Sequence, residues 1–264
     1  MSTLIYAYFY LTSSYKATSE GLDEANSFVK SSEVSISEDS NLITISPKNP
    51  DNKFGVIFLQ GGKVDTNAYV NIMTKLSYKF NSKVYIPKLL FNIAFLSPNA
   101  PDNIINSHPE IENWVLIGHS LGGVVMGNFY DNTVNTPIIR SIQCIKAPCL
   151  QKCTNSKKIS NIVFWGSYAN ANLTDNFSNC LSNSNTIVNI KGDIDGELDM
   201  NSFNLSVKNV PNDFSKFITI TGLNHSTFGD YGLQSGDHQI SRSKDELQQE
   251  IIDDTFQEIF QNSL

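Results

Sequence analysis

Residues 114–123, WVLIGHSLGG, decide the fold of this chain. The run WVLI is continuously apolar, which is typical of a β-strand buried on both faces. It leads into a Gly-x-Ser-x-Gly motif centred on Ser120, and the mostly apolar residues 121–130 then predict a helix. In this strand–turn–helix context the motif indicates a nucleophile elbow, a strained turn that lifts a serine hydroxyl above the end of a sheet. Neighbours in so sharp a turn must lack side chains, and Gly118 and Gly122 meet that need.

Further apolar runs lie on both sides of this motif and alternate with helical patterns. Strands are predicted at residues 34–36, 42–46, 55–59, 83–86, 159–165, 186–190 and 217–220. Helices are predicted at residues 67–80 and 243–260, and another is expected to begin at Pro98 or Pro101. The alternation predicts an α/β protein with a mostly parallel twisted sheet and helices on both faces. In such sheets, functional groups collect beyond the carboxyl ends of the strands.

A serine hydroxyl needs a general base within hydrogen-bond reach, and the base needs an acid that orients it. On this kind of sheet the chain order is serine, acid, histidine. His225 directly follows the last predicted strand and is the expected base, whereas His238 is farther from any strand end. His108 precedes the serine, and the side chain of His119 is expected to project away from the site.

The acid is expected after the strand 186–190, in the segment GDIDGELD at residues 192–199. Three aspartates lie in this segment: Asp193, Asp195 and Asp199. We favour Asp195, because a Gly-x-x-Asp loop lets the chain turn back and present the carboxylate to the imidazole. Asp193 remains the alternative, and an aspartate without this role would be a solvated turn carboxylate.

Two backbone N–H groups are expected to form an oxyanion hole. One belongs to Leu121, which follows the serine at the start of a helix. The other is expected in the loop 60–63 (QGGK), where we favour Gly62 over Lys63 and where an ordinary Gly-Gly turn is the alternative. Residues 89–96 (LLFNIAFL) would either line an acyl pocket or, as we favour, belong to the core or to a loop beside a strand.

Composition excludes some classes of protein. The 264 residues are 40% hydrophobic and 17% charged, which is enough apolar material for a sizeable core. The formal net charge of −7 argues against a nucleic-acid-binding protein, which would carry a basic face. No window approaches the roughly 18 apolar residues of a membrane span. The short apolar run 4–11 (LIYAYFYL) lacks a preceding basic residue and is a poor signal peptide. It leaves weak membrane contact open, and the compartment, cytoplasmic or secreted, undetermined.

Four cysteines lie in the second half of the chain: Cys144, Cys149, Cys153 and Cys180. Free buried thiols are the favoured interpretation, and two disulfides are the alternative. Zinc is the weakest option, because no Cys-x-x-Cys pair and no suitably spaced histidine accompany them. The sequence therefore gives no reason to expect a metal ion.

Taken together, these residues resemble the α/β-hydrolase superfamily, and more closely the group labelled alpha/beta hydrolase family 5. The likeness runs from about Tyr15 to about Gln249. Its most specific motif is NHSTFGDYGLQSGD at residues 224–237. Supporting matches are GGKVDTNAY at 61–69, FNIAFLSPNA at 91–100 and HPE at 108–110, which leads into GHSLGG.

The resemblance implies a single α/β-hydrolase domain at residues 15–264, preceded by an apolar arm at 1–14. An insertion at 138–158, which holds three of the cysteines, looks unlike the compact connection in relatives. The resemblance also implies a triad of Ser120, Asp195 and His225 and an oxyanion loop at Gly61–Gly62.

The expected function is therefore hydrolysis of a carboxylic ester or thioester through an acyl-enzyme. The substrate would be a small acyl compound, and no metal or organic cofactor is required. Two alternatives remain: a non-catalytic binding module with the same fold, and an acyltransferase or amidase that uses the same three side chains.

Overall fold

A computed structural model describes residues 11–51, 53–134, 158–174 and 186–261. The four cysteines, most of the apolar arm and all but the end of the predicted insertion lie outside these residues. Within them the strands form one sheet in the order β1-β2-β4-β3-β5-β6-β7-β8. Their bounds are Val34–Glu38 (β1), Leu42–Pro47 (β2), Phe54–Leu59 (β3), Lys83–Pro87 (β4), Asn113–His119 (β5), Ile159–Trp165 (β6), Ile187–Gly192 (β7) and Ser215–Ile220 (β8).

The neighbouring strands from β4 to β8 in this order all pair in parallel. Only β2 runs against the others, so its pairs with β1 and β4 are antiparallel. The central strands β3 and β5 pair over six residues each and are buried on both faces, as their continuous apolar runs predict. The mostly parallel sheet with helices on both faces is thus confirmed.

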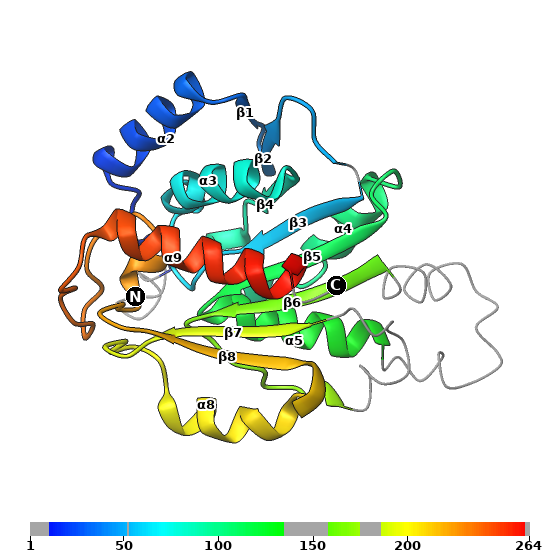
Figure 1. Ribbon diagram of the computed structural model, residues 1–264, viewed down its shortest axis with the longest axis vertical. Coiled ribbons are helices and arrows are strands. Elements are labelled where there is room, and N and C mark those ends of the chain that lie inside the picture. Colours follow the sequence, from blue (N-terminus) through cyan, green and yellow to red (C-terminus); the bar gives the residue numbers. More distant parts are fainter. Residues whose placement is uncertain (1–10, 52, 135–157, 175–185, 262–264) are drawn as a thin grey trace, which may run out of the picture.

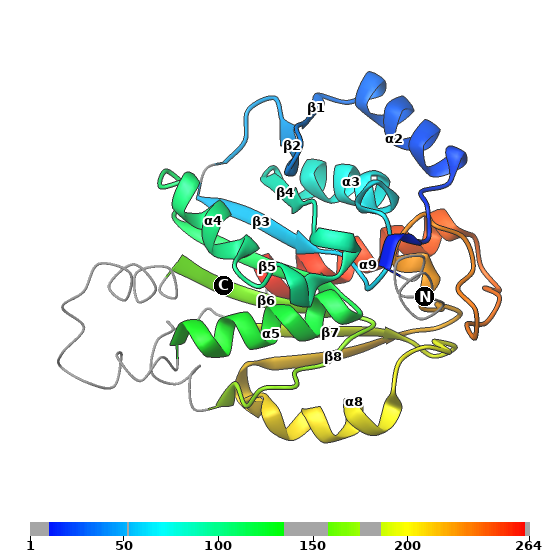
Figure 2. The ribbon, with the colours of Figure 1, turned by 180° about the vertical axis from the view of Figure 1, so that it is seen from behind.

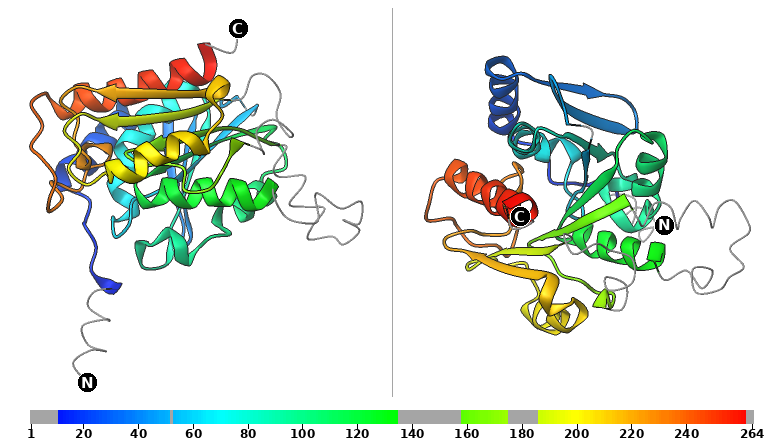
Figure 3. Two further views of the ribbon diagram at one scale, coloured as in Figure 1. Left: turned by 90° about the horizontal axis from the view of Figure 1, so that it is seen from below. Right: turned by 45° about the vertical axis from the view of Figure 1, so that its right-hand side comes forward.

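Helices form a layer on each side of the sheet. One face is covered by α2 (Ser19–Ser31), α3 (Val70–Phe80) and α9 (Lys244–Phe256), whose apolar residues share one buried cluster with that face of the strands. The view from behind in Figure 2 shows α4 (Ala100–Ser107) and α5 (Leu121–Val134) on the opposite face, where a second cluster is buried. A short helix, α8 (Met200–Ser206), lies along the edge strand β8. Figure 3 shows the sheet between the layers of α9 and α5.

This arrangement brings several loops to one rim of the sheet. Parallel strands place all their carboxyl ends on the same side, so the loops that follow β3, β5, β6, β7 and β8 meet there. The segment between β8 and α9 gathers at this rim, at the left of Figure 1. The sequence motifs that follow these strands therefore lie close together in space.

Candidate functional site

Ser120 occupies a strained turn between β5 and α5. Its φ of +51° lies in the left-handed region, which residues with a side chain rarely adopt. A Cβ atom at Gly122 would lie 2.2 Å from the carbonyl oxygen of Leu59, and one at Gly118 would lie 2.4 Å from the Cα atom of Gly123. No side chain fits at either position, so the two motif glycines allow the start of α5 to pack closely against β3 and β5.

The end of β6 holds the backbone of Ser120 from one side. The N–H of Ser120 donates to the carbonyl of Trp165 at 3.0 Å, and the Ser167 hydroxyl donates to the carbonyl of Ser120 at 2.6 Å. Gly166 lies between these two contacts and has a φ of +49°. A side chain that packs on Gly166 therefore lies close to the backbone of Ser120.

A buried carboxylate–imidazole pair packs on Gly166. The Oδ2 atom of Asp195 is 2.9 Å from Nδ1 of His225, and each side chain is only 2% exposed. A Cβ atom at Gly166 would lie 3.1 Å from both of these atoms. The other carboxylate oxygen of Asp195 accepts from the N–H groups of Glu197 and Leu198. These bonds satisfy the buried carboxylate and leave Oδ2 directed at the imidazole.

The other two aspartates of the same loop have different contacts. Asp193 accepts a hydrogen bond from the N–H of Gly222 at 2.7 Å, which ties the loop after β7 to the loop after β8. Asp199 caps α8 by accepting from the N–H groups of Asn201 and Ser202. Neither carboxylate is hydrogen-bonded to His225 in the part of the chain that the structure describes.

His119 does not project away from the site, and that expectation was wrong. Its ring is buried 4.5 Å, centroid to centroid, from the ring of His225. The cause is the loop after β8, which folds back over the face of β5 that carries His119. Burial, followed by the charge of His225, holds the pKa of His119 well below its ordinary value, so the ring is neutral at neutral pH.

Sequence reasoning also missed a tyrosine that connects this histidine to the Gly-Gly loop. The hydroxyl of Tyr69 lies 2.8 Å from Nδ1 of His119 and accepts from the N–H of Gly61 at 3.1 Å. A hydroxyl can donate one hydrogen bond and accept others, so Tyr69 connects the Gly61 N–H to the imidazole whichever His119 nitrogen carries the ring proton. The signal was present in the sequence, because Tyr69 closes the GGKVDTNAY stretch.

The Gly-Gly loop lies beside the start of α5. A Cβ atom at Gly62 would lie 2.9 Å from a methyl carbon of Leu121, so the two residues are in close contact. The N–H of Gly61 is bound by Tyr69, and the N–H of Lys63 donates to the carbonyl of Asn92 at 2.8 Å. Between these two, the N–H of Gly62 has no acceptor among the described residues.

An exposed apolar segment flanks the Gly-Gly loop. Leu90, Phe91, Phe95 and Leu96 are each between 41% and 54% exposed. They belong to two short 3₁₀ turns, Leu90–Asn92 and Ala94–Leu96, which follow β4. Asn92 fixes the segment, because its side-chain oxygen accepts from Gln60 at 2.9 Å and its carbonyl accepts from Lys63. The segment is thus a loop beside a strand, as one expectation had it, and these four side chains are not core.

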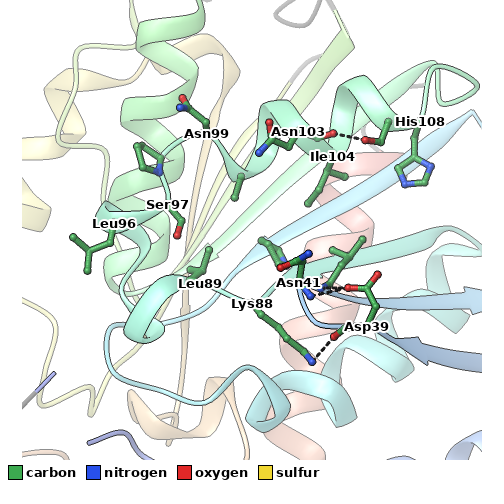
Figure 4. A pocket seen from close by; sticks show the side chains of 15 residues that line it. Asp39, Asn41, Lys88, Leu89, Leu96, Ser97, Asn99, Asn103, Ile104 and His108 are labelled. Carbon is green, nitrogen blue, oxygen red and sulfur yellow. Dashed lines mark hydrogen bonds between the residues drawn. The ribbon is translucent and has the colours of Figure 1, made fainter. Parts of the chain in front are cut away.

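A separate cavity opens behind this segment. It has a volume of about 600 Å³ and lies between residues 39–42, the end of β4 and α4 (Figure 4). Leu89 and Leu96 form its apolar wall, and asparagines such as Asn41 and Asn103 supply polar groups. None of Ser120, Asp195 and His225 lines it.

The described residues contain no group of three or more histidine, cysteine, aspartate or glutamate side chains that would hold a metal ion. None of the helices in the described part of the chain has the length and apolar character needed to cross a bilayer.

Comparisons with known proteins agree with this fold. No curated protein matches the sequence significantly. A predicted CIB-like hydrolase from Thermoplasma acidophilum superposes with a TM-score of 0.53 at 10% identity, over 84% of this chain and 98% of the other. Esterase 2 of Thermogutta terrifontis, phosphorylated by paraoxon, gives 0.53 at 11% identity, over 87% and 94%. A structure described as an arylesterase gives 0.54 at 12% identity, over 92% and 99%.

These likenesses establish the fold, and the sequence itself establishes the family. The family model described as "Alpha/beta hydrolase family" matches residues 55–142 and 147–249, which is well over half of the chain. The chain therefore belongs to the alpha/beta hydrolase family.

Proposed function

We propose that this protein is a serine hydrolase that cleaves carboxylic esters or thioesters through an acyl-enzyme. The observation that carries the proposal is the buried hydrogen bond between Asp195 and His225, packed on the glycine whose two neighbours bind the backbone of Ser120. Nucleophile, base and acid thus share one rim of the sheet, in the chain order that this fold uses.

The proposed chemistry follows from the hydrogen bond. A carboxylate on Nδ1 requires that nitrogen to carry the proton, which leaves Nε2 free to accept the proton of the Ser120 hydroxyl. The serine oxygen attacks the carbonyl carbon, and the imidazolium then returns the proton to the departing alcohol or thiol. A water molecule then gives a proton to His225 and attacks the carbonyl carbon of the acyl-enzyme. The bond to Ser120 breaks, the imidazolium returns the proton to the serine oxygen, and the carboxylic acid is released. Burial of the pair strengthens these interactions, because little water screens them.

The oxyanion would be held by the N–H groups of Leu121 and Gly62. Leu121 is the first residue of α5, and helix starts leave N–H groups without an intrahelical acceptor. Gly62 lies in contact with Leu121, and its N–H has no acceptor among the described residues, unlike that of Lys63. Because Tyr69 and Asn92 bind the residues on either side, the loop is held in one position before substrate arrives.

Two observations support this substrate class, the first an apolar acyl group and the second an ester bond. The four exposed apolar side chains of residues 90–96 adjoin the oxyanion loop through Asn92. Among proteins of this fold, the esterase that is phosphorylated by paraoxon has an ester-type reagent bound covalently. The membrane contact that the apolar arm left open is not needed for this proposal.

The test compares the wild-type chain with Ser120→Ala on p-nitrophenyl acetate, butyrate and octanoate. Loss of the nucleophile is expected to lower kcat/KM by at least about 10³-fold. Ser160→Ala is the matched control, because that hydroxyl donates to the carbonyl of Trp114 inside the sheet and should leave turnover within about twofold.

Equal turnover by wild type and Ser120→Ala would reject the assignment of the nucleophile. A folded wild-type protein with no turnover of any ester or thioester would favour the non-catalytic module instead. Faster consumption of ester in the presence of an added alcohol or amine, with acyl product on that acceptor, would identify a transferase.

A further inference from the structure

Asp237, the last residue of the 224–237 motif, accepts four hydrogen bonds at the junction of two loops. Its Oδ1 atom accepts from the N–H of Gly196 at 3.0 Å and from the N–H of His225 at 3.2 Å. Its Oδ2 atom accepts from the N–H and the hydroxyl of Ser226, at 2.7 and 2.6 Å. One carboxylate therefore binds the backbone beside the proposed acid and the backbone of the proposed base.

The acid and the base need such a connection. Asp195 and His225 lie on different loops, and only a 2.9 Å contact between side-chain tips joins the two groups themselves. Gly196 directly follows the acid, so Oδ1 of Asp237 fixes the main chain on both sides of that contact with a single atom. In enzymes, a displacement of about 1 Å in a reacting group costs roughly 10²-fold in rate.

Neighbouring contacts strengthen the same connection. The ring of His238 lies 3.1 Å from the carbonyl of Ile194, which precedes the acid, and the carbonyl of His238 accepts from the side chain of Asn224, which precedes the base. A Cβ atom at Gly196 would lie 2.5 Å from the carbonyl oxygen of Gly236, and Gly236 has a φ of +99°. Glycine at both positions lets the backbones of the two loops approach closely.

The charge of Asp237 suits this role. Burial alone would raise the pKa of this half-buried carboxyl. The Ser226 hydroxyl and the N–H groups of Gly196, Ser226 and His225 outweigh burial and hold the pKa below its ordinary value. The group is therefore an anion at neutral pH, and charge-assisted hydrogen bonds to an anion are stronger than neutral ones.

We propose that Asp237 is a positioning residue that holds the loops of Asp195 and His225 in register for the reaction. The inference rests on the proposed serine hydrolase function. Asp237 itself need not touch the substrate, and it acts through the geometry of the carboxylate–imidazole pair.

The test compares Asp237→Ala with Asp199→Ala. Asp199 is the control because its carboxylate likewise binds backbone N–H groups and a hydroxyl, with two N–H donors instead of three, but does not bind the base. Both variants should lose thermal stability, and Asp237→Ala should lose more, because it removes one more hydrogen bond at a less exposed position. Asp237→Ala is expected to lower kcat about 10- to 100-fold with KM within about twofold, while Asp199→Ala keeps kcat within about twofold.

A second readout does not depend on turnover. The proton between Asp195 and His225 should give a low-field NMR signal, assigned by its absence in Asp195→Ala. We expect that signal in the wild type and in Asp199→Ala, and expect it to be shifted or broadened in Asp237→Ala. Should Asp237→Ala fail to fold, Asp237→Asn and Ser226→Ala test the same contacts more gently, with smaller losses of kcat expected.

The inference is overturned if a folded Asp237 variant keeps both the kcat and the low-field signal of the Asp199 control. A wild-type protein that turns over no substrate but whose signal still depends on Asp237 would reject the proposed function alone. The positioning of the pair by Asp237 would then stand as a structural fact without a reaction.

Discussion

The two sides of Ser120 are built differently. On the proposed acid–base side, residues 192–199 and 222–238, the side chains of Asp195 and His225 are buried, and the carboxylates of Asp193, Asp195 and Asp237 accept hydrogen bonds from backbone N–H groups. On the oxyanion side, residues 60–63 and 89–96, the backbone is equally well held, but the side chains that face outward are apolar and exposed. The contrast suggests that the chemistry depends on fixed polar contacts, whereas the choice of acyl group depends on a surface that tolerates change.

The largest expected effect tests the acid–base side within a single loop. Asp195→Asn keeps the shape of the side chain but removes the charge that stabilises the imidazolium, so kcat should fall about 10³- to 10⁴-fold. Asp193→Asn keeps an oxygen that can accept from Gly222 and should stay within about threefold. The measurement is kcat for p-nitrophenyl butyrate at neutral pH. The assignment of the acid fails if Asp193→Asn shows the larger loss.

A smaller effect is expected on the oxyanion side. Phe95→Ala removes apolar surface that a long acyl chain would cover, and each buried methylene contributes about 0.8 kcal/mol. The ratio of kcat/KM for octanoate to that for acetate should fall about three- to tenfold, while acetate itself changes less than twofold.

Tyr78→Ala provides the control for this measurement. Tyr78 is another exposed aromatic residue, but it lies on α3 against Phe28 of α2, in the opposite helix layer from α4 and α5. An unchanged acyl-length preference in Phe95→Ala would mean that the exposed segment does not contact the acyl group.

The central fold could be predicted because its strands and its nucleophile turn each have a distinctive sequence pattern. Strands such as β3 and β5 are continuously apolar, and the glycines of the elbow fit only a close approach of helix to strand. Helices α2 and α8 were not expected. The apolar residues of α2 do recur at helical spacing, at Leu22, Ala25, Phe28 and Val29, but polar residues surround them, and α8 has just seven residues, too few for a clear apolar stripe.

For the candidate site, the sequence could name residues but not the contacts between them. Chain order and strand ends point to Ser120, Asp195 and His225 without any knowledge of distance. The orientation of His119 and the role we propose for Asp237 depend on how the loop after β8 folds back across the rim. Long-range packing of that kind leaves no periodic pattern in the sequence. For the apolar run 89–96 the sequence left core and loop open. Leu89 and Ala94 are buried and Leu90, Phe91, Phe95 and Leu96 are exposed, because hydrophobicity alone does not determine exposure.

The central claim, that Ser120 is an activated nucleophile, is tested most directly by its reaction with a fluorophosphonate. The folded wild-type chain should gain the mass of one phosphonyl group, and peptide mapping should place it on Ser120. Butyrate ester should slow the reaction, and Ser120→Ala should gain no mass. Absence of any adduct on the folded wild type, or an adduct on a different serine, would contradict the account.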